Sequence, residues 1–158
     1  MRASLPVVAL PRPGVFAPPA GPDPARPDVT PADLPVVLGA FYDAAGGEPL
    51  LAGYFAPLDM RAHLPRVAAF WDTLLFGAGT YQGSAFLPHQ ALAGLTAAHF
   101  ARWVAVLEAT VDARHAGPVA EQLKATGHRI ATAMQLRLGV APTAAACQGN
   151  PDRASGPR

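Results

Sequence analysis

The sequence has little charge, one cysteine and no apolar run long enough to cross a membrane. Charged residues make up 15% of its 158 positions and the formal net charge is +1, so no strong field attracts nucleic acid or an acidic membrane surface. Cys147 is the one cysteine, which excludes a disulfide framework and a multi-cysteine zinc or iron–sulfur site. Proline, glycine or charge interrupts every apolar run, so we expect no transmembrane helix. These absences predict a cytoplasmic protein that binds neither nucleic acid nor a membrane.

Proline is concentrated near the start of the sequence. Nine of the 18 prolines lie in the first fifth of the chain, where each removes a backbone donor and restricts the preceding residue. Residues 1–29 are therefore predicted to be an extended, disordered tail. Residues 140–158 combine proline with alanine, glycine and serine and are predicted to be a second disordered tail. The folded domain should then span residues 30–139, which is long enough for one hydrophobic core.

Apolar residues recur with a helical period in the predicted domain, and no segment alternates with a period of two for long enough to form a strand. Start signals, such as the Thr30–Asp33 capping box, and terminal glycines divide the region into four main helices. The predicted helices run from Thr30 to Gly47, from near Asp59 to Gly77, onward from Thr96, and from Pro118 to Gly139. A loosely wound stretch over residues 77–95 separates the second from the third. The sequence therefore predicts an all-α fold.

Familiar catalytic motifs are absent from the sequence. It has no G-x-S-x-G elbow, no Walker loop and no G-x-G-x-x-G after a strand. No two of its five histidines are three or four residues apart, which excludes a helical two-histidine zinc site. His89 differs from the others because it follows the glycine-rich stretch 77–83 and begins a short amphipathic turn that ends at Leu92. Such a histidine either binds a flat prosthetic group or lies in a surface loop, and spacing alone favours the surface loop.

Several short motifs occur in a fixed order between Phe41 and Leu138. They are Phe41-Tyr42, the apolar turn from Pro49 to Phe55, His63-Leu64 followed by Phe70-Trp71, the stretch from Leu74 to Gly83, His89-Gln-Ala-Leu92, His99-Phe100-Ala-Arg102-Trp103 and, more weakly, the residues from Arg129-Ile130 onward. Their order and spacing together resemble the group III truncated haemoglobins, which are small bacterial two-over-two globins. The resemblance implies a truncated globin-like two-over-two helical sandwich.

The resemblance also implies a haem b (iron protoporphyrin IX) held non-covalently between the helices. By alignment His89 is the proximal ligand of the iron, a role that suits a neutral imidazole. Its other ring nitrogen should donate a hydrogen bond to a backbone carbonyl or to water, which would fix the ring.

On the distal side the resemblance assigns three polar residues. Tyr42 is expected to donate a hydrogen bond to a bound ligand, the alternative being a core tyrosine bonded to backbone. The indole N–H of Trp103 would find its acceptor in the ligand or the Tyr42 oxygen, or Trp103 is an ordinary core residue. His63 occupies the distal position on its helix, but Pro65 follows within that helix. A helix that begins near Leu64, or is kinked there, would leave His63 in solvent.

The remaining site residues are expected to form the walls and edge of the pocket. The candidate wall residues are Phe55, Phe70, Trp71, Tyr81, Leu92, Phe100 and Val104. The candidates for pairing with the haem propionates are Arg61, Arg66 and Arg102. Ala85 stands where the family tends to carry proline. The other histidines, His99, His115 and His128, are expected to face solvent or to cap helices.

The function that the resemblance implies is the binding of O₂, NO or CO at a His89-ligated iron beside a polar distal pocket. An alternative is a haem-dependent redox enzyme, peroxidase-like or NO dioxygenase-like, that works with a separate reductase. Donors that hold O₂ also stabilise O–O cleavage, so the distal residues suit both functions. A third possibility is a helical protein that has lost haem, against which His89 argues.

Overall fold

A computed structural model describes residues 26–140, and all the regular structure in this range is helical, which confirms the all-α prediction. The remainder of the two predicted tails, residues 1–25 and 141–158, lies outside the described residues. The elements are the 3₁₀ turn η1 (Pro31–Asp33) and the helices α1 (Leu34–Gly47), α2 (Ala52–Phe55), α3 (Met60–Phe76), α4 (Leu87–Gln90), α5 (Ala97–Asp112) and α6 (Pro118–Leu138). No helix within residues 26–140 has the length and apolarity that a membrane span needs.

The helix ends lie close to where the local signals predict them. Asp33 accepts hydrogen bonds from both the N–H and the hydroxyl of Thr30, at 2.9 and 2.6 Å, and so completes the capping box. Asp59 caps α3 by accepting from the N–H of Arg61 at 3.0 Å. Gly77 and Gly139 end α3 and α6 in the left-handed conformation, at φ of 71° and 66°, which glycine adopts without strain. Local chemistry therefore accounts for most of the boundaries of the long helices.

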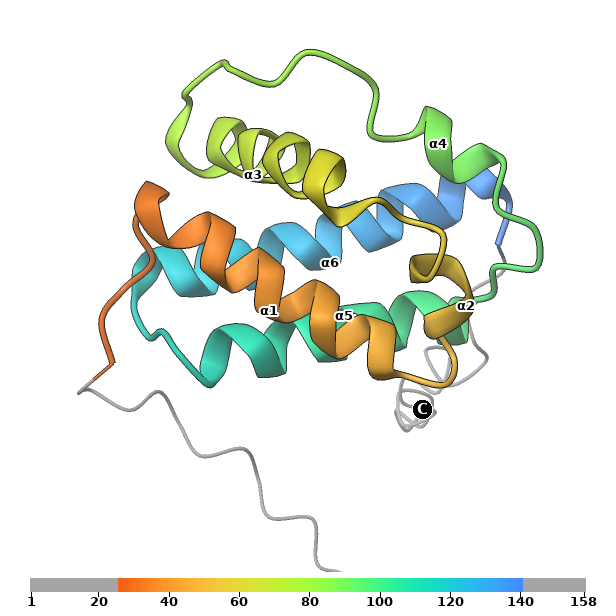
Figure 1. Ribbon diagram of the computed structural model, residues 1–158, viewed down its shortest axis with the longest axis horizontal. Coiled ribbons are helices and arrows are strands. Elements are labelled where there is room, and N and C mark those ends of the chain that lie inside the picture. Colours follow the sequence, from red (N-terminus) through yellow and green to blue (C-terminus); the bar gives the residue numbers. More distant parts are fainter. Residues whose placement is uncertain (1–25, 141–158) are drawn as a thin grey trace, which may run out of the picture.

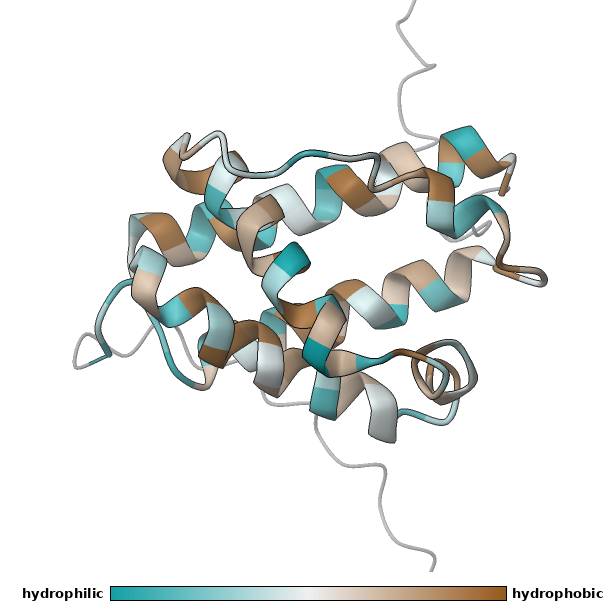
Figure 2. Ribbon diagram, turned by 45° about the horizontal axis from the view of Figure 1, so that its top comes forward, coloured by the Kyte–Doolittle hydropathy of each residue, from teal (hydrophilic) through white to brown (hydrophobic). Residues whose placement is uncertain are grey.

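The four long helices pack in pairs. Helices α5 and α6 form an antiparallel pair, while α1 packs against both α5 and α3 (Figure 1). Short α2 follows α1, and the loop after α3 arches back to α4, which lies near the C-terminal end of α6 (Figure 1). Polar and apolar residues alternate in bands along the helices (Figure 2), as expected of amphipathic helices.

The buried apolar side chains form two separate groups. The main cluster lies between α1, α3, α5 and α6 and consists of Val29, Leu34, Val37, Leu38, Phe41, Ala45, Leu51, Trp71, Val106, Leu107, Val111, Ala120 and Leu123. The minor cluster joins the other halves of α5 and α6 and consists of Phe100, Val104, Ala131 and Met134. Trp103 and Ile130 pack against both clusters.

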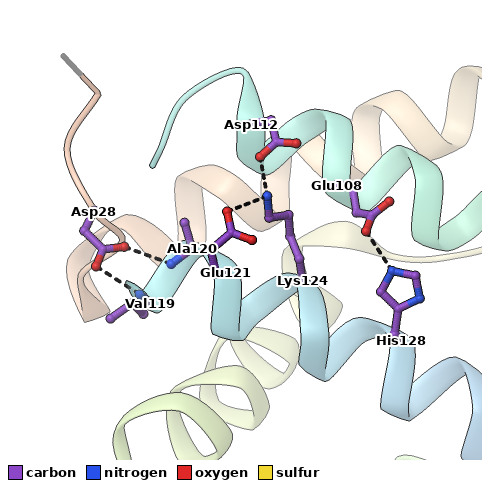
Figure 3. Close-up of polar contacts among 8 residues, drawn as sticks. All are labelled: Asp28, Glu108, Asp112, Val119, Ala120, Glu121, Lys124 and His128. Atoms are coloured by element: carbon purple, nitrogen blue, oxygen red, sulfur yellow. Dashed lines mark hydrogen bonds and ion pairs between the residues drawn. The ribbon is translucent and has the colours of Figure 1, made fainter. Parts of the chain in front are cut away.

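Residues 27–29, which the sequence analysis places in the N-terminal tail, pack against the fold instead. The carbonyl of Pro27 accepts from the N–H of Ala116 at 3.1 Å and from the ring of His115 at 3.2 Å. The side chain of Asp28 accepts from two N–H groups in the first turn of α6 (Figure 3). His115 is therefore buried and does not face solvent, contrary to expectation.

Ion pairs join the two helices of the α5–α6 pair on its surface. Lys124, the one lysine of the chain, lies between Asp112 and Glu121 at 2.6 and 2.8 Å (Figure 3). His128 is exposed and pairs with Glu108 (Figure 3). These contacts keep His128 on the outer face of the pair.

Candidate functional site

Helix α3 and the segment 77–96, which contains α4, carry most of the candidate site residues. Although α3 is rich in apolar residues, Trp71 is its one buried residue. Leu64, Val67 and Phe70 are only partly buried, against the main cluster. None of the four residues of α4 is buried. Both elements therefore present apolar side chains that the rest of the described protein covers only in part.

His89 lies on α4 with its ring held by the backbone. Its Nδ1 is 2.7 Å from the carbonyl oxygen of Ala85, four residues earlier. A carbonyl oxygen only accepts hydrogen bonds, so Nδ1 must carry the proton. In the neutral ring the proton on Nδ1 leaves a lone pair on Nε2, which is the atom that a metal would bind. The hydrogen bond expected for a proximal histidine is present, and its partner is the Ala85 carbonyl.

Tyr42 and His63 form a direct hydrogen bond. The phenol oxygen of Tyr42, on α1, is 2.9 Å from Nε2 of His63, on the first turns of α3, and the two rings meet edge to face. Helix α3 begins at Met60 and continues through Pro65, so this proline does not delay the start of the helix. His63 therefore contacts Tyr42, and the alternative in which Pro65 leaves His63 in solvent is excluded.

Burial keeps this pair neutral at neutral pH. Burial raises the pKa of the Tyr42 hydroxyl well above its ordinary value of 10.0. Burial also lowers the pKa of His63 below 6.5, and the positive charge of Arg66 lowers it further. Tyr42 and His63 thus form a hydrogen-bonded pair of a neutral phenol and a neutral imidazole.

Aromatic rings surround the Tyr42–His63 pair. Phe41 is 1% exposed and meets Trp103 edge to face, with ring centroids 5.4 Å apart. Phe55 meets Tyr42 in the same manner at 5.5 Å. Phe41 therefore points into the main cluster, whereas Tyr42 points towards His63. Two adjacent residues of a helix are expected to point in different directions in this way.

The other predicted wall residues do not all share one surface. Phe70 and Tyr81 meet edge to face at 5.1 Å and so join α3 to the segment 77–96. Trp71 lies in the main cluster and Phe100 in the minor cluster, with 3% and 8% of their surface exposed. Leu92 is exposed, at 36%. The structure thus places Trp71 and Phe100 in the packed core, whereas Phe70 and Tyr81 bridge two elements of the candidate site.

The three candidate arginines are not equivalent. Arg102 makes two hydrogen bonds to the carboxylate of Glu48 at the end of α1, which directs its guanidinium towards that helix. This pair borders a surface groove of about 380 Å³ between α1 and α5. Half of the residues that line the groove are alanines, and Arg102 is the one predicted site residue among them. Arg61 and Arg66, both exposed on α3, are the remaining candidates for pairing with an anionic group beside His63.

Two residues near the site were not singled out by the sequence. Tyr54 of α2 donates a hydrogen bond to the carbonyl of Ala93 at 2.9 Å. The hydroxyl of Thr73 on α3 accepts from the N–H of Tyr81 at 3.2 Å. Each contact joins a helix to the segment that carries His89. No local pattern predicts them, because in each case the partner is a backbone group in a loop.

Comparison with solved structures supports a fold assignment. The chain is similar to the crystal structure of group III truncated haemoglobin from Campylobacter jejuni, with a TM-score of 0.63 and 19% sequence identity. The match covers 70% of this chain and 91% of that one. No family model and no curated protein matches the sequence. The order of the helices and the structural match together show that this chain has the truncated globin fold.

Proposed function

We propose that the chain binds haem b between α3 and α4 and, through it, binds O₂, NO or CO. The observation that carries this proposal is the fixed ring of His89. The Ala85 carbonyl, 2.7 Å from Nδ1, holds the proton on that nitrogen and leaves the Nε2 lone pair free to bind iron. Haem bound there would supply an iron that His89 would hold and that can bind a diatomic ligand.

The residues around His89 fit such a group. Haem is flat and mostly apolar, and α3 and α4 present apolar side chains that the protein leaves partly uncovered. The buried apolar residues are divided into the main and minor clusters, with Trp103 and Ile130 packed against both. A flat apolar group between α3 and α4 would bury more of the partly covered α3 side chains. Each Å² of apolar surface so removed from water contributes about 25 cal/mol.

Tyr42 and His63 decide where a proton is offered to the ligand. If Nε2 of His63 carries a proton, it donates to the Tyr42 oxygen, and the phenol proton is free to point at the ligand. If Nε2 carries none, Tyr42 donates to His63 and offers only a lone pair. The tautomer of His63 therefore sets whether Tyr42 acts as a donor. A hydrogen bond from Tyr42 of about 1.5 kcal/mol would slow ligand escape roughly tenfold.

Trp103 is the third polar residue that we assign to the ligand pocket. Its ring packs against Phe41 and lies between the two clusters. Within residues 26–140 its indole N–H makes no hydrogen bond, so this donor would be available to the ligand. We propose Phe55, Phe70, Tyr81 and Leu92 as the walls of the pocket, and Arg61 or Arg66 as the partner of a propionate.

Titration of the full chain with haemin tests the proposal. We expect stoichiometric uptake, and ferrous and CO absorption spectra typical of histidine-ligated haem. In His89→Ala the uptake or the spectra should change, whereas His128→Ala should match the wild type because His128 is exposed and paired with Glu108. A wild type that takes up no haemin refutes the proposed function. Identical spectra for His89→Ala and the wild type refute His89 as the ligand.

Turnover separates ligand binding from the redox alternative. A stable oxy form supports binding, whereas sustained consumption of NO or peroxide with an added electron source supports an enzyme. A reductase partner and a cytoplasmic location stay predictions.

A further inference from the structure

The segment 77–96 carries His89 but has little structure of its own. Its one helix, α4, has four residues, and helices this short are not stable in isolation. Three of its glycines before α4, Gly77, Gly79 and Gly83, have positive φ values of 71°, 64° and 154°. The position of His89 therefore depends on contacts between this segment and the long helices.

One such contact lies on the N-terminal side of His89. The hydroxyl of Thr73 donates to the carbonyl of Ala69 within α3, at 2.9 Å, which directs its proton away from the loop. The Thr73 oxygen then accepts from the N–H of Tyr81 at 3.2 Å. The ring of Tyr81 packs edge to face on Phe70, one turn earlier on α3. This contact ties the loop to the helix that carries His63.

The second contact lies on the C-terminal side of His89. Tyr54 of α2 donates to the carbonyl of Ala93 at 2.9 Å, four residues beyond His89. The ring of Tyr54 is held edge to face against His99, near the start of α5, with centroids 5.3 Å apart. Tyr54 thus joins α2, α5 and the end of the segment.

Apolar packing also holds the segment, but it is less directional than a hydrogen bond. Ala85, Phe86 and Leu95 pack against the minor cluster, and Arg137 of α6 lies over the Phe86 ring at 5.3 Å. Hydrogen bonds weaken steeply as their distance and angle depart from the optimum. One such bond on each side of His89 therefore constrains its position more narrowly than apolar packing does.

We infer that Thr73 and Tyr54 are positioning residues that fix the segment carrying His89 against α2 and α3, an inference that rests on the proposed haem function. They act through the segment that His89 belongs to and touch neither His89 nor its Ala85 partner in any hydrogen bond described for residues 26–140. The wild type should therefore release haem more slowly than variants that lack either hydrogen bond.

The test removes each hydrogen bond without changing the shape of the side chain. Tyr54→Phe and Thr73→Val are compared with the wild type in the rate at which the loaded full chain transfers haemin to excess apomyoglobin. We expect release about fivefold faster for each variant and about 25-fold faster for the double variant, since the bonds lie on different helices. Thr73→Ser keeps the acceptor and should match the wild type. Thr110→Val is the matched control, because Thr110 makes the same bond within a helix but contacts no loop amide.

A second background separates positioning from general stability. In His89→Gly the iron is supplied with free imidazole, which has no covalent link to the segment. If Tyr54 and Thr73 act through His89, their substitution should no longer change haem release in this background. An effect of the same size there would show a merely structural role and overturn the inference.

Amide hydrogen exchange of the haem-free chain provides a measurement that does not depend on haem. Tyr54→Phe and Thr73→Val should exchange faster than the wild type within residues 77–96 and equally elsewhere. Unchanged exchange in that segment overturns the inference. A wild type that retains no haem overturns the proposed function together with the inference. A wild type that retains haem, with Tyr54→Phe and Thr73→Val releasing it at the wild-type rate, overturns the inference alone.

Discussion

The hydrogen bond between Tyr42 and His63 should have a measurable coupling energy. It joins two neutral, partly buried side chains at 2.9 Å, and such a bond contributes about 0.5–1.5 kcal/mol net. Tyr42→Phe removes only the hydroxyl and leaves Nε2 of His63 without its partner. Because His63 is only partly buried, water can replace that partner, so we expect a loss near the low end of the range for an unsatisfied group, about 1 kcal/mol.

A double-mutant cycle isolates this bond. Urea unfolding of the haem-free full chain is measured for the wild type, Tyr42→Phe, His63→Leu and the double variant. The double variant should lose about 1 kcal/mol less stability than the sum of the single losses, because the second substitution has no bond left to break. Losses that add to within about 0.3 kcal/mol would refute the coupling.

The same pair gives a pH dependence with a definite sign. Burial and the positive charge of Arg66 lower the pKa of His63 below 6.5 in the folded state. The unfolded chain therefore binds more protons than the folded chain as the pH falls below that value, and stability is lost on acidification. His63→Leu has no such group and should lose less stability than the wild type between pH 7 and pH 5. Equal declines in the free energy of unfolding of the wild type and His63→Leu over this range would contradict the lowered pKa of His63.

Three further predictions concern the packing of the fold. Asp28→Ala removes the acceptor of two N–H groups in the first turn of α6, at Val119 and Ala120, and should cost about 1–2 kcal/mol in urea unfolding; no loss would contradict the cap. Burial alone would raise the pKa of Asp28, but its hydrogen bonds from backbone N–H groups hold it below 3.8. Stability should therefore fall as the pH drops through that lowered pKa, and Asp28→Asn should flatten this part of the pH profile. Gly127→Ala would place a Cβ 2.5 Å from a methyl group of the fully buried Leu107. The variant should unfold at a lower urea concentration, equivalent to a loss of about 1–3 kcal/mol in the free energy of unfolding.

Local signals in the sequence predict the long helices well. Capping residues and terminal glycines act within a few positions, so Thr30, Asp59, Gly77 and Gly139 identify ends that the structure reproduces to within a few residues. The fold follows from these helices and their apolar faces. Helix α4 is harder to predict, because four residues are too few to show a period.

Contacts between distant residues are not encoded in any local pattern. His63 is 21 positions from Tyr42, and the proline that follows it within α3 leaves two alternatives open in the sequence, a distal position and exposure to solvent. The proline-rich composition before residue 30 predicts a tail, yet Asp28 within it caps a helix about 90 positions later. Backbone acceptors such as the Ala85 carbonyl leave no side-chain signal at all. These features arise only when the helices pack.

The hydrogen-bond partners of the five histidines distinguish His89 from the other four. The Nδ1 of His99 accepts from a backbone N–H at 3.1 Å, so its neutral ring carries the proton on Nε2 and has no free lone pair. His128 is exposed and paired with a carboxylate. His115 resembles His89 in facing a backbone carbonyl through Nδ1, but it is buried beside the α5–α6 turn, where the N-terminal residues cover it. Nε2 of His63 is bonded to a phenol. Only His89, within residues 26–140, combines a protonated Nδ1 with an Nε2 that lies on an incompletely buried apolar segment. The proposal that His89 is the iron ligand therefore has a physical basis in the ring's hydrogen-bond partner as well as in the resemblance to truncated haemoglobins.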